Sequence, residues 1–191
     1  DKGWLYRGYR PMPWCTRCGT SLSQHELADS YKEITHEAVY IKLPVTGEVD
    51  LFFLVWTTTP WTLTANTALA VNPELEYVKV RQGEETYILS AARLEALEGE
   101  HEIVGKVKGS QLVGLSYRGP IDIPARQQAR LHVIPWNEVS ADEGTGIVHI
   151  APGCGAEDYE LSRTLDLEVI MPIDESGMYP AEGYEEFGGE N

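Results

Sequence analysis

The chain has 191 residues, 42% of them hydrophobic, so it is long enough to bury one good core. Its 30 acidic and 15 basic residues give a net charge of -15, which argues against extended binding to a phosphate backbone, because such binding needs clustered Lys and Arg. No apolar run approaches the ~20 residues that span a bilayer and no signal peptide opens the chain, so we expect a cytoplasmic chain that is part of a longer protein and has no membrane contact.

Residues 1–35 combine an aromatic-rich stretch, a turn with two cysteines and a polar segment, which is typical of a connector. Three cysteines in the whole chain do not make a disulfide framework. Cys15 and Cys18 have the spacing of a zinc knuckle, but a tetrahedral structural site needs four ligands. We therefore expect half of a structural zinc site here, completed by a second pair outside this chain; the alternative is two ordinary reduced cysteines.

Short β-type runs separated by turn residues follow from Ala38 onward. We expect strands at residues 39–43, 50–56 and 77–80, and weaker ones at 86–89, 103–107, 111–115 and 131–134. Helices are expected at residues 90–97, where Ser90 caps and Gly99 stops the helix, and at 156–165, whose acidic first turn complements the helix dipole. These elements predict an α+β, mainly β fold: a compact β-barrel-like core over residues 36–175 with a few peripheral helices, followed by a return connector over 176–191.

The segment W-T-T-T-P-W-T-L, residues 56–63, places hydroxyls where an apolar strand emerges. Alternate side chains of a strand share a face, so Thr57 and Thr59 are expected together and Thr58 opposite. Pro60 ends the ladder and keeps Thr59 extended. Threonines also favour β-structure for its own sake. Three in a row between two tryptophans nevertheless favour a hydroxyl-lined site.

The segment G-T-G-I-V-H-I-A-P-G-C-G-A-E-D-Y, residues 144–159, contains a glycine turn, a short apolar strand that presents His149, and a second turn that opens a helix with Asp158. A crossover of this length can bring His149 and Asp158 to one cleft, and functional sites often use such loops on rigid elements. Alone, His149 would more often be structural and Asp158 a helix-start charge. The glycines match neither the Walker pattern nor the dinucleotide fingerprint.

Common hydrolase machinery is missing from the sequence, which has neither a Gly-x-Ser-x-Gly elbow nor a His-Glu-x-x-His helix. Cys154 lies five residues after His149, but nothing else marks it as an activated nucleophile. A positioned water acting on an already activated bond, such as an α-amino acid ester, is therefore the favoured chemistry for any hydrolysis.

Together the two segments resemble the editing insertion, or connective polypeptide 1, of class I aminoacyl-tRNA synthetases, and residues 56–63 are most similar to the isoleucyl form. Valyl and leucyl forms typically have Arg before the proline and an acidic residue after it, where this chain has Thr59 and Trp61. The resemblance covers essentially the whole chain, including the connector with Cys15 and Cys18. Family members often have histidine or an aromatic residue at the position of Cys154.

The resemblance implies a pocket between the threonine strand and the Gly-Thr-Gly turn. Asp158 would bind the substrate's α-ammonium group, and His149 would shape the side-chain pocket so that valine enters and isoleucine does not. Catalytic residues would be Thr57, Thr58, Thr59 and Asp158. Substrate-binding residues would be Trp56, Asn66, Gly144, Thr145, Gly146, His149 and Asp158.

The resulting expectation is post-transfer editing: hydrolysis of the ester bond of valyl-tRNA that carries the isoleucine anticodon, with valyl-adenylate as a further candidate substrate. No cofactor is needed for this step, and structural zinc is expected only in the longer protein. The partners would be the 3′ end of mischarged tRNA, its valine moiety and the remainder of the synthetase, with the chain itself a monomer. The alternatives are a valyl- or leucyl-type editing domain, and an isolated binding module for aminoacyl-adenosine with little turnover.

Overall fold

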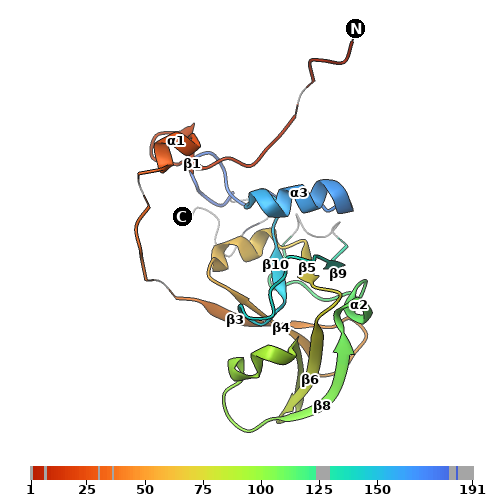
Figure 1. Ribbon diagram of the computed structural model, residues 1–191. Coiled ribbons are helices and arrows are strands. Elements are labelled where there is room, and N and C mark those ends of the chain that lie inside the picture. The colour runs from red at the N-terminus through yellow and green to blue at the C-terminus, as the bar shows by residue number, and fades with distance from the viewer. Residues whose placement is uncertain are drawn as a thin grey trace.

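The computed structural model describes residues 2–6, 8–29, 31–35, 37–123, 130–180 and 184. Two β-sheets dominate this part of the chain, with short helices at their edges (Figure 1). The predicted mainly β class is therefore confirmed, and its barrel-like core corresponds to two sheets that share one hydrophobic cluster. Within the described ranges, no helix has the length and apolar character needed to cross a membrane.

The larger sheet has five strands in the order β3-β4-β7-β6-β8. Its strands are β3 (Val39–Pro44), β4 (Leu51–Thr57), β6 (Glu76–Gln82), β7 (Glu85–Ser90) and β8 (Glu102–Lys108). The pairs are antiparallel except for β4 and β7, which run parallel. Five predicted strands, at 39–43, 50–56, 77–80, 86–89 and 103–107, are confirmed here.

The smaller sheet has the order β10-β5-β9, with β10 (Val148–Ile150), β5 (Ala68–Val71) and β9 (His132–Pro135). All four residues of the central strand β5 are buried. Leu69 and Val71 face the cluster shared with the larger sheet, while Ala68 and Ala70 face a second cluster that includes side chains of α3. The short strand β10 pairs antiparallel with β5 and places His149 opposite Leu69. Because β5 is covered on both faces, the backbone of His149 is anchored to the core.

The helices are short: α1 (Gln24–Leu27), α2 (Gly109–Leu112), α3 (Ala156–Leu165) and the 3₁₀ helices η1 (Pro60–Ala65) and η2 (Ala91–Ala96). The helix predicted at 156–165 is confirmed as α3. The helix predicted at 90–97 is a kinked 3₁₀ segment, in which Arg93 leaves helical geometry with φ of -119°.

The strand predicted at residues 111–115 is wrong, because this stretch begins with the last residues of helix α2. Gly109 packs so tightly against the chain that a Cβ there would lie 2.0 Å from Asn72 O. The Gln111 side chain accepts a 3.0 Å hydrogen bond from Lys108 N and closes the first turn. The close approach and the cap together favour one helical turn over an extended strand.

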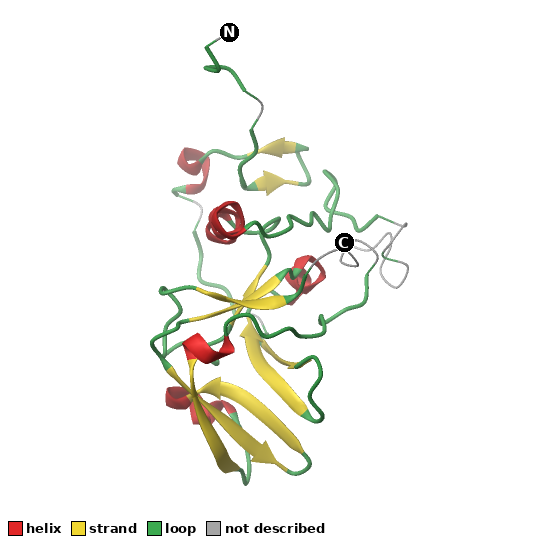
Figure 2. Cartoon of the chain, turned by 90° about the vertical axis from the view of Figure 1, so that its right-hand side faces the viewer, coloured by secondary structure: helices red, strands yellow, loops and turns green. Residues whose placement is uncertain are grey.

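The N-terminal connector forms a small hairpin of β1 (Trp14–Cys15) and β2 (Thr20–Ser21), which lies beyond α3 and away from the five-stranded sheet (Figure 2). Trp14 Nε1 donates a 2.7 Å hydrogen bond to Glu175 O. Gly177 also approaches the side chain of Thr16 closely. The incoming and outgoing ends of the described domain therefore touch. The expected boundaries after 35 and 175 stay predictions, and residues 181–183 and 185–191 lie outside the described residues.

Candidate functional site

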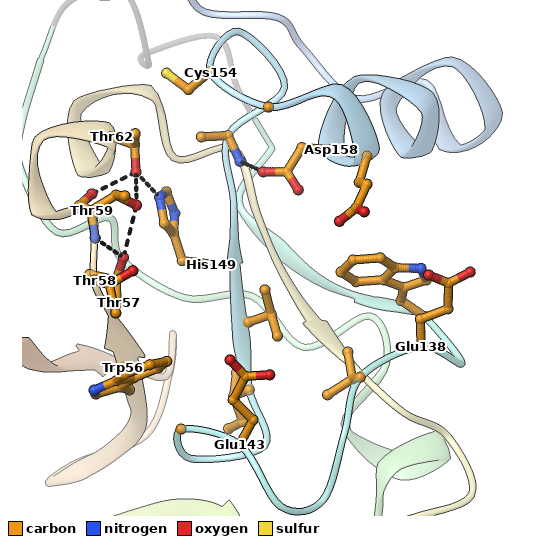
Figure 3. Close-up of a pocket in the computed structure, with 18 of the residues that line it drawn as sticks. Trp56, Thr57, Thr58, Thr59, Thr62, Glu138, Glu143, His149, Cys154 and Asp158 are labelled. Carbon is orange, nitrogen blue, oxygen red and sulfur yellow. Dashed lines mark hydrogen bonds between the residues drawn. The ribbon is translucent and has the colours of Figure 1, made fainter. Parts of the chain in front are cut away.

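A cavity of about 520 Å³ lies where the end of β4, strand β10 and the start of α3 meet. Its size is within the range of small-molecule sites. The cavity is lined by Trp56, Thr57, Thr58, Thr59, Trp61, Thr62, Trp136, Glu138, Val139, Ser140, Glu143, Gly144, Ile147, Val148, His149, Ala151, Cys154, Gly155, Glu157 and Asp158. Figure 3 shows the threonines and His149 on one side of the β10 ribbon and Asp158 on the other.

The threonine wall is a connected set of hydroxyls at the end of β4. Oγ1 of Thr57 and Oγ1 of Thr59 are 3.3 Å apart, so the two side chains lie together as predicted. The extended backbone predicted for Thr59 is wrong, because β4 ends at Thr57 and Thr59 has ψ of 65°, and Thr58 lines the same cavity. Thr59 N donates to Thr57 Oγ1 across 3.1 Å, which holds the turn between the end of β4 at Thr57 and the start of η1 at Pro60. The wall continues to Thr62 in η1, whose Oγ1 lies 3.3 Å from that of Thr59. These contacts keep the hydroxyl positions fixed before any ligand enters.

His149 extends from β10 toward this wall, with its side chain only 8% exposed. Its Nε2 lies 2.8 Å from Thr62 Oγ1, and its Nδ1 lies 2.9 Å from Nδ2 of Asn66. Asn66 is fully buried and supports the ring from behind; it does not line the cavity. The ring is thus held at both nitrogens.

Asp158 is held at the first turn of α3, where Oδ2 accepts a 2.7 Å hydrogen bond from Ala151 N. Burial raises the pKa of this carboxyl, the Ala151 hydrogen bond lowers it in part, and the charge of Glu157 raises it further. A cationic group in the pocket would favour the ionised carboxylate and offset much of the desolvation that burial imposes on its charge. Asp158 is therefore suited to an ammonium group.

The Gly-Thr-Gly turn forms another wall, but only Gly144 lines the cavity. Thr145 and Gly146 are buried behind it. Tyr77 donates a 2.8 Å hydrogen bond to Gly146 O, and Arg93 Nε donates a 2.9 Å bond to Gly144 O. The turn is therefore a rigid support fixed from the larger sheet and η2.

Four carboxylates line the cavity, those of Glu138, Glu143, Glu157 and Asp158, and no Lys or Arg is among the described lining residues. The wall after β9, which includes Trp136 and Glu138, was not predicted. Nothing in its sequence distinguishes it from an ordinary surface loop, because its part in the cavity depends on the parallel pairing of β9 with β5. The excess of negative charge favours a ligand whose buried end is cationic.

Cys154 is exposed at the rim of the cavity. The pocket walls still desolvate its thiol, and with the charge of Asp158 they raise the pKa of Cys154 to about 11. The sulfur is therefore a protonated thiol at neutral pH, which agrees with the expectation that it is not a nucleophile.

Cys15 and Cys18 lie in the turn of the N-terminal hairpin, where Cys18 N donates to Cys15 O across 3.2 Å. The hydrogen bond between the two side chains lowers the pKa of the Cys15 thiol and raises that of the Cys18 thiol. Within the described ranges no group of three or more His, Cys, Asp or Glu residues could hold a metal ion. The two thiols fit half of a tetrahedral zinc set, and the other half stays a prediction for residues outside this chain.

No protein-family model matches the chain. It is 45% identical over 185 residues to an isoleucine–tRNA ligase of Methanothermobacter thermautotrophicus, covering 95% of this chain and 17% of that protein. It is 41% identical over 179 residues to the isoleucine–tRNA ligase of Clostridium acetobutylicum, covering 94% of this chain and 17% of that protein. The chain belongs to the isoleucine–tRNA ligase family. It spans about a sixth of the length of these relatives.

Solved structures with a similar fold show which part of a synthetase this isoleucine–tRNA ligase segment resembles. The crystal structure of GlLeuRS-CP1 matches with a TM-score of 0.60 at 23% identity, covering 68% of this chain and 60% of that chain. The editing domain of the cytosolic leucyl-tRNA synthetase of P. falciparum matches with a TM-score of 0.56 at 18% identity, covering 69% and 68%. The isoleucine–tRNA ligase segment thus has the fold of a synthetase editing domain.

Proposed function

We propose that this isoleucine–tRNA ligase segment hydrolyses the ester bond of valyl-tRNA that carries the isoleucine anticodon. The observation that carries the proposal is the cavity that combines a hydroxyl wall, the fixed ring of His149 and the buried carboxylate of Asp158. An aminoacyl ester presents an ammonium group, a small side chain and an activated carbonyl, and each has a matching wall. Valyl-adenylate, which has the same aminoacyl end, is a further candidate substrate.

The need for such a site follows from the similarity of valine and isoleucine. They differ by one methylene, which a hydrophobic pocket discriminates by only about 1–3 kcal/mol, a limit for which isoleucine–tRNA ligases are the standard example. A second site that admits valine and excludes isoleucine multiplies the discrimination. We assign the steric exclusion of isoleucine to His149. Both ring nitrogens are hydrogen-bonded, so the ring cannot move aside without breaking a hydrogen bond.

In the proposed reaction Asp158 accepts the α-ammonium group of the valyl ester, which places the ester carbonyl toward the threonine wall. A water molecule attacks the carbonyl carbon, and the bond between that carbon and the ribose oxygen breaks. The leaving ribose oxygen takes up a proton, so that the products are free valine and uncharged tRNA. Hydroxyls of Thr57, Thr58 and Thr59 orient the water and the carbonyl, and the chemistry of the ester needs no cofactor.

The test is to incubate the chain with valyl-tRNA and isoleucyl-tRNA of the isoleucine anticodon and to follow release of the amino acid. We expect selective release of valine. A matched pair of valyl- and isoleucyl-adenosine esters separates chemistry from tRNA affinity. Equal or absent release from all four substrates at high protein concentration would refute the proposal for this segment.

The same substrates distinguish the alternatives. A binding module would bind valyl-adenosine, measured by calorimetry, without releasing valine. A leucyl- or valyl-type site would release other amino acids, so norvaline and threonine esters belong in the panel. We favour the isoleucyl type because Thr59 and Trp61 flank Pro60 in this chain and because its relatives are isoleucine–tRNA ligases. The remainder of the synthetase would deliver the 3′ end of the tRNA to the cavity.

A further inference from the structure

A chain of hydrogen bonds connects the core of the domain to the threonine wall through His149. At its inner end the Tyr117 hydroxyl donates to Asn66 Oδ1 across 2.7 Å. The amide nitrogen of Asn66 lies 3.0 Å from Ala68 O and 2.9 Å from His149 Nδ1. Tyr117 is 3% exposed, Asn66 is fully buried, and neither lines the cavity. Both therefore act on the site from behind its wall.

A backbone carbonyl, which can only accept, sets the direction of this chain at the Asn66 end. Because Ala68 O faces the Asn66 amide, the amide must present its nitrogen there, and the same nitrogen then donates to His149 Nδ1. At the outer end Thr59 O lies 2.8 Å from the Thr62 hydroxyl and can take its single proton, which leaves the Thr62 oxygen to accept from His149 Nε2. The Asn66 end requires a ring with an unprotonated Nδ1, and the geometry at the Thr62 end fits the protonated Nε2 that a neutral ring must then carry.

We propose that Tyr117 and Asn66 are positioning residues that hold His149 in its neutral Nε2–H tautomer and fix the ring as a wall of the pocket. In this state both ring nitrogens are engaged. His149 cannot take a proton from an attacking water without breaking a buried hydrogen bond. His149 therefore contributes to selectivity as a steric wall and does not act as a general base. This role in selectivity rests on the function proposed above.

Tyr117 is suited to this role because its ring is anchored in the core. It packs edge to face against Phe53, with centroids 6.4 Å apart and planes at 86°. Core packing thereby fixes where the hydroxyl lies and which way it points. Tyr117 adds a second hold on the amide to the one that Ala68 O provides. Loss of the hydroxyl would remove this buried donor from Asn66 Oδ1, so the amide would turn more easily and hold His149 Nδ1 less firmly.

The direct test is nitrogen-15 NMR of the imidazole rings, with the His149 signals assigned by their loss in His149→Gln. In the wild-type chain we expect a pyridine-like shift at Nδ1 and a pyrrole-like shift at Nε2, unchanged from about pH 6 to about pH 8, across the range in which an ordinary histidine titrates. A protonated Nδ1 or a titrating ring in the wild-type chain would overturn the proposal.

The part played by Tyr117 is tested with Tyr117→Phe, which keeps the ring and removes the hydroxyl. We expect the two His149 nitrogen shifts to move toward each other and the preference for valyl over isoleucyl ester to fall about fivefold. The matched control is Tyr87→Phe, whose hydroxyl donates to Glu85 and whose ring belongs to a separate cluster with Leu54 and Val80. The control should keep the wild-type shifts, and wild-type shifts in Tyr117→Phe would overturn the role of Tyr117.

A second variant covers the case in which Tyr117→Phe does not fold. Asn66→Asp changes the amide nitrogen to an oxygen with nearly the same shape, and a carboxylate can only accept. His149 must then carry a proton at Nδ1, and persistence of the wild-type shifts would contradict the proposal. The NMR readout does not depend on catalysis. A chain with the expected shifts but no ester hydrolysis would retain this inference and refute the proposed function.

Discussion

At the scale of single residues, Asp158 combines a functional charge with a cost to the fold. Because burial raises its pKa in the folded state, the folded protein binds a proton more tightly than the unfolded chain between the two pKa values. The free energy of unfolding therefore falls as pH rises through that window. The ionised carboxylate that we assign to ammonium binding therefore lowers the free energy of unfolding of the protein without a ligand.

Asp158→Asn should separate these two effects. The amide can still accept from Ala151 N, so we expect its stability relative to wild type to increase from about pH 3 to about pH 7 in urea titrations. Hydrolysis of valyl ester should fall at least tenfold, because the charge-assisted bond to the ammonium group is lost. Glu160→Gln, on the exposed face of the same helix, is the control and should change neither property, because it removes only an exposed ion pair with Arg163. An active Asp158→Asn would refute the ammonium role.

Cys154 should be chemically quiet in spite of its exposure. With a pKa of about 11, only roughly one thiol in a thousand is ionised at about pH 8, whereas the pKa of Cys15 is lowered. Alkylation with iodoacetamide, followed by mass spectrometry of peptides, should therefore modify Cys15 before Cys154. Cys154→Ala should hydrolyse valyl ester at nearly the wild-type rate. Rapid modification of Cys154 would show that the pocket activates this thiol.

At the scale of elements, the Gly-Thr-Gly turn depends on a close approach of two backbones. Gly146 has φ of +71°, and a Cβ there would lie 2.4 Å from Ser90 Cβ. Gly83, in the β6–β7 turn, has φ of +62° with open space around it. The two positions share the backbone strain and differ in packing.

Gly146→Ala and Gly83→Ala therefore form a matched pair. Gly83→Ala should lower the free energy of unfolding by about 1–2 kcal/mol, the cost of a left-handed residue with a side chain. Gly146→Ala should cost a further ~1–3 kcal/mol for overpacking, and should also reduce hydrolysis because the wall beside Trp56 moves. Equal unfolding free energies of the two variants in urea would show that Ser90 moves aside for the new methyl group without loss of stability.

The elements also show what sequence patterns can and cannot predict. Helix α3 was predictable to the residue because an acidic first turn and a glycine before it mark its start. Strand β5 was not predicted, since Ala68–Val71 is buried on both faces and shows no alternation. In the site, the strand period predicts that Thr57 and Thr59 lie together, but the contact arises from the turn after β4, which Thr59 N closes on Thr57 Oγ1. The partners of His149 do not follow from any sequence pattern, because Tyr117 reaches Asn66 only through the tertiary fold.

At the scale of the whole molecule, charge decides how the chain can meet its substrate. The chain carries -15 in total, and the cavity itself is lined by four carboxylates. A tRNA body would be repelled by this charge, whereas a neutral or cationic aminoacyl-adenosine would not. Under the proposed function, affinity for tRNA would come from other parts of a synthetase, since the chain spans about a sixth of the length of its relatives.

This balance predicts an unusual salt dependence. Enzymes that bind nucleic acids with basic surfaces lose affinity as salt rises. Binding releases counterions from the phosphate backbone, and this release favours the complex less at a higher salt concentration. For this chain kcat/KM on valyl-tRNA should stay constant or rise between about 50 and about 200 mM salt, as repulsion is screened. Valyl-adenosine ester, which has no phosphate, serves as the control and should show no change. A steep fall with salt for valyl-tRNA alone would instead reveal a basic tRNA-binding surface on this chain, and would move tRNA delivery into the editing domain itself.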